Sequence, residues 1–111
     1  MARELIQKES EGANGWTVWQ VFGRVDTQTA RQASEKGTEI VNRCEKTVLD
    51  AAGVDYLSSA GLRVLLQLNK LASKSGKKFV VANPTEMVRA VIEDSGMDAL
   101  LTMKTSLDEL E

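Results

Sequence analysis

The chain has 111 residues, of which 42% are hydrophobic and 27% are charged, and its formal net charge is −2 at pH 7. This length is enough for one hydrophobic core, and the composition is typical of a globular domain. The sequence has no basic block and no basic stripe with interleaved aromatic residues, which argues against a nucleic-acid-binding protein. It has no histidine and only one cysteine, so it lacks the commonest general base and transition-metal ligand and cannot form an internal disulfide.

No segment of the sequence is suited to entering or crossing a membrane. No apolar run approaches the length that spans a bilayer. Residues 1–10 lack the hydrophobic core of a secretory signal. We therefore expect a cytoplasmic protein without membrane insertion.

The first part of the chain predicts a β-hairpin. Residues 4–10 and 16–22 are strand candidates, and Asn14-Gly15 between them is a strong hairpin signal. Both faces of residues 16–22 are largely apolar, so this strand is expected inside a sheet rather than at its edge.

A helix is predicted to follow the hairpin. Small or apolar residues recur at helical spacing from Ala30 to Cys44, which predicts one face packed on a sheet and Cys44 as a packed thiol. Asp26 or Thr27 can serve as the N-cap of this helix.

The middle of the chain predicts a strand, a tight loop and a second helix. Residues 46–52 form the expected third strand, and Gly53 and Asp55 predict the loop. Helical spacing of apolar residues then continues to about Ser75, where Gly76 is a natural stop.

Two serines, Ser58 and Ser59, stand where this second helix is expected to begin. The first backbone N–H groups of a helix lack internal acceptors and carry partial positive charge. Either hydroxyl can therefore cap the helix, and a phosphoryl group at this point is well accommodated. Residue chemistry alone leaves both roles open.

The apolar arc of the second helix is wider than packing on a sheet requires. The polar residues share one narrow face at helical pitch and are Arg63, Gln67, Lys70 and Lys74. Either neighbours flank the helix on both sides, or the part of the arc near Val64 and Leu68 is left for a partner.

The last third of the chain continues the alternation of strands and helices. Residues 77–82 predict a strand, and Thr85 can cap a helix over residues 86–95. A short strand is expected at 100–103, and the capping-box pattern at 106–109 predicts a final short helix. The alternation predicts an α/β domain.

The residues around the two serines resemble a known family. Residues 56–62, Tyr-Leu-Ser-Ser-Ala-Gly-Leu, are similar to the signature loop of the STAS domain in bacterial anti-sigma factor antagonists. The serine that a partner kinase phosphorylates in that family falls on Ser59. Ser58 stands where aspartate is frequent and is a second candidate acceptor, and Ala60 stands where serine or threonine is frequent.

A second stretch resembles another recurrent STAS motif, with matches at Gly23, Val25, Asp26 and Ala30. From the residues alone, Asp26 is a plain helix cap. The resemblance implies in addition that this aspartate lies close to the phosphorylatable serine and contributes to the partner-binding face. Arg24 departs from the motif, because an acidic or polar residue is frequent there.

The resemblance extends over nearly the whole chain and implies a single STAS domain over residues 1–111. The expected fold is a four- to five-stranded mixed β-sheet packed with about four α-helices. The residues expected on the partner-binding face are Asp26, Thr27, Ser58, Ser59, Ala60, Gly61, Arg63 and Val64.

The function that the resemblance implies is that of an anti-sigma factor antagonist. When unphosphorylated, such a protein binds an anti-sigma factor that is also a GHKL-type serine kinase, so that a sigma factor is released. Phosphorylation ends this binding, and a PP2C-type phosphatase restores it. The alternative is a STAS partner-switching or scaffold module for another target, such as secretion, motility or a transporter complex.

An enzyme is the competing class of function. Ser59 on a strand-to-helix turn is similar to a hydrolase nucleophile, but the Gly-x-Ser-x-Gly pattern is absent. Asp26, Asp50 and Asp55 could together hold Mg²⁺, yet their spacing matches no metal-binding loop. We expect no catalytic activity, no resident cofactor and no metal site, with ATP and Mg²⁺ belonging to the kinase.

Overall fold

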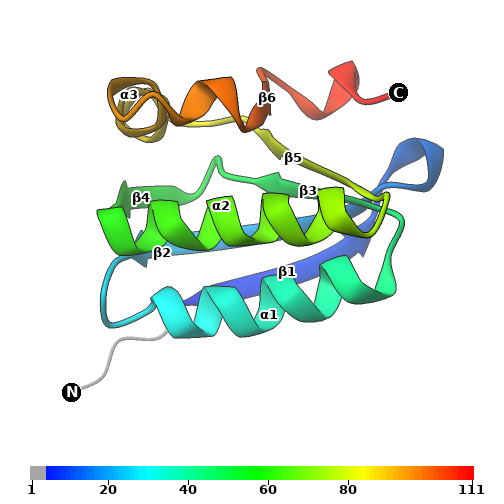
Figure 1. The fold of residues 1–111 in the computed structure, drawn as a ribbon, viewed down its shortest axis with the longest axis horizontal. Helices are drawn as coiled ribbons and strands as arrows, with labels where there is room; N and C mark the ends of the chain where they lie inside the picture. Colours follow the sequence, from blue (N-terminus) through cyan, green and yellow to red (C-terminus); the bar gives the residue numbers. More distant parts are fainter. Residues whose placement is uncertain (1–4) are drawn as a thin grey trace.

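The computed structural model describes residues 5–111, and residue 4, the predicted start of the first strand, lies outside this range. The described residues form six strands, three α-helices and three short 3-10 helices (Figure 1). In chain order these are β1 (Ile6–Glu11), η1 (Ala13–Gly15), β2 (Thr17–Val25), α1 (Ala30–Arg43), β3 (Lys46–Asp50), β4 (Val54–Leu57), α2 (Ser59–Lys74), β5 (Lys78–Ala82), α3 (Glu86–Asp94), η2 (Met97–Ala99), β6 (Thr102–Lys104) and η3 (Leu107–Glu109).

The strands form one mixed sheet in the order β1-β2-β3-β5-β6, with β4 paired to β2. Only β1 is antiparallel to its neighbour, and the other pairs are parallel. Residues Thr17–Gln20 of β2 pair with β3, and Gly23–Val25 pair with β4, so β3 and β4 follow one another along the same strand. The predicted α/β class and mixed sheet are confirmed.

The strand β4 differs from the sequence prediction, which placed a loop there. After β3 the chain turns, and the Gly53 carbonyl accepts a hydrogen bond from the Gly23 N–H at 2.9 Å. It then re-enters the sheet, where Val54 and Leu57 are buried while Asp55 and Tyr56 are exposed. Such a short segment beside a glycine lacks the apolar alternation by which a strand is identified from sequence.

The two faces of the sheet are covered unequally. The helices α1 and α2 lie side by side across one face, and α3 packs beside β4 (Figure 1). Their buried residues and the facing strand residues form the main core. The opposite face carries a small cluster that is covered by Leu107 and Leu110, and its buried members are Trp16, Val18, Val48, Val80 and Ala82.

The hairpin and helix-end predictions are largely confirmed. Asn14 and Gly15 both have positive φ, and the Trp16 N–H donates to the Ala13 carbonyl at 3.2 Å, which closes the turn between β1 and β2. Thr85 caps α3, since its Oγ1 accepts from the Val88 N–H at 3.2 Å.

The C-terminal predictions are met less closely. The strand β6 begins at Thr102, so Leu100 lies before it, and the final helix is only the 3-10 turn η3. The packed thiol is confirmed: Cys44 is partly buried and accepts a hydrogen bond from the Thr17 Oγ1 at 3.2 Å.

The wide apolar arc of α2 is covered by other elements of the domain. Val64 and Leu68 are 5% and 2% exposed, so the alternative in which they are left for a partner is wrong. Neighbours flank the helix, and α1 approaches closely because Gly37 has no side chain. A Cβ at that position would lie 2.6 Å from Leu68 Cδ1 and 2.7 Å from Trp19 Cη2.

Candidate functional site

The two sequence motifs meet at one end of the sheet. There β2 and β4 end side by side and α1 and α2 begin, on the left in Figure 1. Val25 pairs with Leu57, and the Ser58 N–H donates to the Val25 carbonyl at 2.9 Å. The segment that follows Val25 and the start of α2 therefore form one continuous surface.

Ser58 is the N-cap of α2. Its backbone is extended, with φ −86° and ψ 175°, and its Oγ accepts a hydrogen bond from the Gly61 N–H at 3.2 Å. Its carbonyl accepts the first helical bond from the Leu62 N–H at 2.8 Å. The side chain and both backbone groups of Ser58 are thus engaged within the fold, which is the arrangement that N-cap serines provide.

Ser59 is the first residue of α2 and is exposed. Its hydroxyl has no hydrogen-bond partner among residues 5–111. The N–H groups of Ser59 and Ala60 have no acceptor within the helix, and the first turn holds no acidic residue. The hydroxyl therefore projects from a helix end of partial positive charge.

Gly61 allows α2 to begin close against the sheet. A Cβ at this position would lie 2.7 Å from the Val25 carbonyl oxygen and 2.7 Å from Leu57 Cδ1. The backbone oxygen cannot move aside without disturbing the end of β2. The glycine thus fixes where Ser58 and Ser59 stand relative to the second motif.

Asp26 stabilises the turn before α1, and its carbonyl also accepts from the N–H of Ala30, the first residue of the helix, at 2.8 Å. Its Oδ1 accepts from the Gln28 N–H at 3.0 Å, and its N–H donates to Thr29 Oγ1 at 3.0 Å. The helix starts at Ala30 with Thr29 as the N-cap residue. The prediction that Asp26 or Thr27 is the N-cap of this helix is therefore wrong, because the turn over residues 27–29 precedes the helix and its last residue, Thr29, is the N-cap.

An arginine and a tyrosine that the sequence analysis did not assign to the partner-binding face complete this surface. Arg24 and Tyr56 are paired in register, and the guanidinium carbon of Arg24 lies 4.2 Å from the centre of the Tyr56 ring. The Arg24 Nε also lies 3.6 Å from Asp26 Oδ2. This contact depends on the register in which β2 pairs with β4. The sequence analysis did not predict β4, so it could not predict the contact.

The predicted partner-binding residues differ in exposure. Thr27, Ser59 and Arg63 are exposed. Asp26, Ser58 and Ala60 are half-buried, with their segment still at the surface. Gly61 and Val64 are buried, and Val64 belongs to the main core. Val64 is therefore not available to a partner, since its side chain faces the sheet rather than solvent.

The acidic residues considered for a metal site do not form one cluster. Asp50 is 8% exposed, and its Oδ1 accepts from Asn83 Nδ2 at 3.1 Å and from the Ala52 N–H at 3.2 Å. Asp55 is exposed on β4, and Asp26 lies in the turn before α1. Within residues 5–111, no three side chains of His, Cys, Asp or Glu are arranged to hold a metal ion. No helix in that range is both long and apolar enough to cross a membrane.

The fold and this surface define an α/β domain that presents an exposed serine at a helix start beside the end of a parallel strand. The chain belongs to the STAS domain family, whose model matches residues 7–110. It is 26% identical over 112 residues to the anti-sigma F factor antagonist of Paenibacillus polymyxa, covering 96% of each chain. It is 33% identical over 85 residues to BtrV of Bordetella bronchiseptica, whose name places it among anti-sigma factor antagonists, covering 76% of this chain and 73% of BtrV.

Solved structures share the fold. An anti-sigma factor antagonist from Mycobacterium paratuberculosis superposes with a TM-score of 0.85 at 24% identity, covering 95% of this chain and 89% of that one. The phosphorylated form of the Bacillus cell fate determinant SpoIIAA superposes with a TM-score of 0.70 at 16% identity, covering 94% and 95%.

Proposed function

We propose that the protein is an anti-sigma factor antagonist that is switched off by phosphorylation of Ser59. When unphosphorylated, it binds an anti-sigma factor that is also a GHKL-type serine kinase, and a sigma factor is released. A PP2C-type phosphatase reverses the modification. The names of the relatives in Paenibacillus polymyxa and Bordetella bronchiseptica support this class of function.

The observation that carries the proposal is the division of roles between two adjacent serines. The Ser58 hydroxyl accepts the Gly61 N–H and holds the start of α2. The Ser59 hydroxyl is exposed and has no partner among the described residues. A kinase can therefore modify Ser59 without removing the cap, whereas modification of Ser58 would break it.

The surroundings of Ser59 accommodate a phosphate within this fold. A phosphate adds about −1.5 to −2 charges at neutral pH. The unpaired N–H groups of the first helical turn favour that charge, and the exposed Arg63 lies one turn further along the same face. The domain should therefore keep its structure after phosphorylation.

A partner seated over Ser59 experiences the opposite effect. Any acidic or apolar surface that contacts the Ser59 hydroxyl would be repelled by the added charge or would have to desolvate it. Each loss of about 1.4 kcal/mol lowers affinity tenfold, so a few kcal/mol are enough to end binding. The protein itself acts as a substrate and a ligand, and the catalytic base, ATP and Mg²⁺ belong to the kinase.

The proposal is tested by affinity capture from an extract of the source cells, with bound proteins identified by mass spectrometry. Wild type and Ser59→Ala should both retain a GHKL-type kinase, and Ser59→Asp should lose it. Ser10→Asp is the matched control, because it adds the same charge at an exposed position of β1 that pairs with Val18, far from Val25 at the other end of β2.

Two outcomes would contradict the proposal. One is equal retention of the kinase by Ser59→Ala and Ser59→Asp. The other is capture of transporter, secretion or motility components by every variant with no kinase, which would leave the family assignment in place and favour the scaffold alternative.

A further inference from the structure

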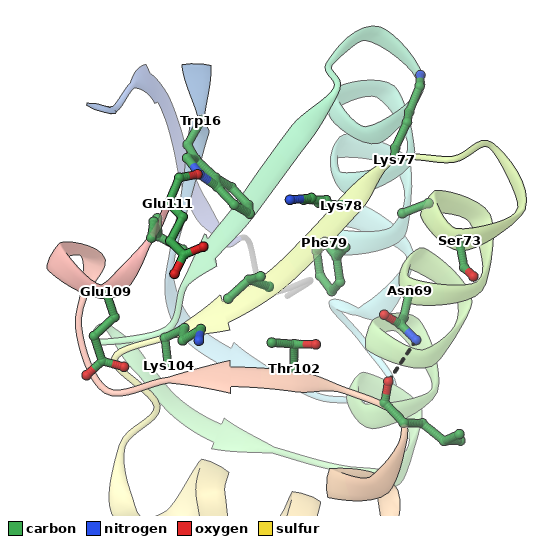
Figure 2. Close-up of a pocket in the computed structure, with 14 residues that line it drawn as sticks. Trp16, Asn69, Ser73, Lys77, Lys78, Phe79, Thr102, Lys104, Glu109 and Glu111 are labelled. Carbon is green, nitrogen blue, oxygen red and sulfur yellow. Dashed lines mark hydrogen bonds between the residues drawn. The ribbon is translucent and has the colours of Figure 1, made fainter. Parts of the chain in front are cut away.

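A basic groove lies along the C-terminal half of α2, away from Ser59. Two open hollows of about 520 Å³ and about 430 Å³ flank this part of the helix. Both are lined by Asn69, Ser73 and Leu100, so they adjoin one another. The larger hollow is bounded by β5, β6 and the C-terminal segment (Figure 2). Together they form one depression, which we call the lysine groove after Lys70, Lys74, Lys78 and Lys104.

The charge of the groove is opposite to that of the whole chain. Five lysines and two glutamates line the two hollows, whereas the net charge of the protein is −2. Lys70, Lys74, Lys78 and Lys104 form no ion pair with a carboxylate of residues 5–111. Lys104 already acts electrostatically on Glu109 in the same hollow, whereas the charges of Lys70, Lys74 and Lys78 are available to an acidic ligand.

The fifth lysine, Lys77, forms hydrogen bonds that stabilise the fold. Its Nζ donates to the Val41 carbonyl at 3.0 Å and to the Asn42 carbonyl at 2.7 Å, at the end of α1. Figure 2 shows Lys77 pointing away from the hollow, while Lys78 extends from β5 across it toward Trp16. Neighbouring lysines thus have distinct roles, one structural and one directed into the groove.

An apolar side chain stands where the two hollows meet. Leu100 is 61% exposed, and its carbonyl is fixed by a hydrogen bond from Asn69 Nδ2 at 3.0 Å. The partly buried Leu66 lines the smaller of the two hollows. The strand β6 pairs only with Val80–Ala82, so no strand of the described chain covers Lys78 and Phe79 on this side. A ligand here can contact apolar and basic groups together.

The C-terminal segment of the chain lies beside this surface. Its sequence from residue 107 is Leu-Asp-Glu-Leu-Glu. Leu107 and Leu110 pack on the sheet face opposite α1 and α2, and the Glu111 carbonyl accepts hydrogen bonds from Trp16 Nε1 and Lys46 Nζ at 2.9 and 3.2 Å. Residues 109–111 then form one wall of the larger hollow. A segment that combines leucine and acidic residues, partly folded as the turn η3, is therefore already packed beside the groove.

We propose that the lysine groove binds an extended, acidic, leucine-containing segment of a partner protein. Leucine-sized side chains of that segment pack on Leu100, and its carboxylates pair with Lys70, Lys74 and Lys78. The site lies at the opposite end of α2 from Ser59 and does not depend on the proposed phosphorylation. The protein could thereby hold one partner while the start of α2 is free.

The test uses a fluorescein-labelled peptide that repeats Leu-Asp-Glu-Leu-Glu twice, with affinity measured by fluorescence anisotropy on the full chain. We expect binding that weakens with added salt, as for exposed charge pairs. Lys74→Glu and Lys78→Glu should each lower affinity about tenfold, and Leu100→Ser should also weaken binding. Arg31→Glu is the matched control, because Arg31 is 90% exposed on α1 and its reversal changes the net charge equally.

A second measurement locates the bound peptide. In ¹⁵N NMR titrations, amide shifts should move at Ser73, Phe79 and Leu100 and stay unchanged at Ser59. The proposal is overturned if the peptide does not bind, or if a neutral Leu-Asn-Gln-Leu-Gln peptide binds equally well. It is also overturned if Arg31→Glu weakens binding as much as Lys74→Glu, or if only anionic lipid vesicles are bound.

Discussion

The two ends of α2 present different kinds of surface. At its start, Gly61 packs against the Val25 carbonyl and Ser58 caps the helix, so that backbone and side chains are tightly constrained. Along its C-terminal half, Lys70 and Lys74 border an open groove and form no ion pair with described residues. One end has no acidic side chain in its first helical turn and is held in a fixed geometry, and the other carries several lysines and is open.

The difference suggests how one small domain can serve two kinds of recognition. A surface without acidic side chains in its first helical turn changes its character strongly when one phosphate is added. A surface that already carries several lysines changes little with one modification and favours acidic ligands permanently. The constrained end is suited to a switch, and the basic end to constant attachment.

The largest effect on stability is expected from Gly61→Ala at the constrained end. The added methyl group would meet a backbone oxygen at 2.7 Å, and such overpacking costs about 1–3 kcal/mol. Urea unfolding should show a lower midpoint with an unchanged slope. Ser59→Ala, two residues earlier, should leave the midpoint nearly unchanged. Equal stability of Gly61→Ala and wild type would refute the close approach of α2 to β2.

The next largest effect on stability is expected to differ between Ser58 and Ser59. Ser58→Ala removes the acceptor of the Gly61 N–H and should cost about 1 kcal/mol in the free energy of unfolding, as other N-cap substitutions do. Ser59→Ala should change it by less than about 0.5 kcal/mol, because the side chain is exposed. If the costs were reversed, the assignment of cap and acceptor would be wrong.

At the basic end, Lys77→Met and Lys78→Met form a matched pair. Lys77 donates to two carbonyls at the end of α1, and its loss should cost about 1 kcal/mol, the contribution of a cation at a helix C-terminus. Lys78 has no such bond, so Lys78→Met should alter stability by less than about 0.5 kcal/mol. Equal effects in thermal or urea unfolding would argue that both lysines are structural.

The smallest effect is expected from an ion pair that lies away from both ends and serves as a reference. Hydrogen bonds from Arg43 at 2.8 Å, together with the nearby Lys36, lower the pKa of Glu9 from 4.5. Ionised Glu9 therefore stabilises the folded state above pH 4.5, and this contribution is lost as pH falls through the lowered folded pKa.

For such a partly exposed pair the contribution is at most about 1 kcal/mol. The difference in unfolding free energy between wild type and Glu9→Gln should be present at pH 7 and shrink in acid. A difference that grows below pH 4 would contradict the assignment.

The sequence predicted the parts of the fold that depend on local patterns. The hairpin turn at Asn14, the cap at Thr85 and the end of α2 before Gly76 follow from residue types with strong local preferences, and all three are found. Ser58 and Ser59 were expected at the start of α2, and the structure divides the two roles that sequence left open.

The features that the sequence did not predict depend on tertiary pairing. The strand β4 exists because residues 54–57 find a partner in the end of β2, which its own pattern does not indicate. The contact between Arg24 and Tyr56 follows from that register. Val64 was assigned to a partner surface because a wide apolar arc does not reveal which neighbours cover it. The lysine groove likewise gathers residues from α2, β5 and β6.

The central claim is that phosphate on Ser59 ends partner binding while the fold persists. The most direct measurement is the affinity of the captured kinase for the protein carrying phosphoserine at position 59, compared with the unmodified protein and with phosphoserine at position 58. We expect at least about a hundredfold loss for position 59, equivalent to about 2.7 kcal/mol, with an unchanged far-UV spectrum. Unchanged affinity with phosphoserine at position 59, or loss confined to position 58, would contradict the account.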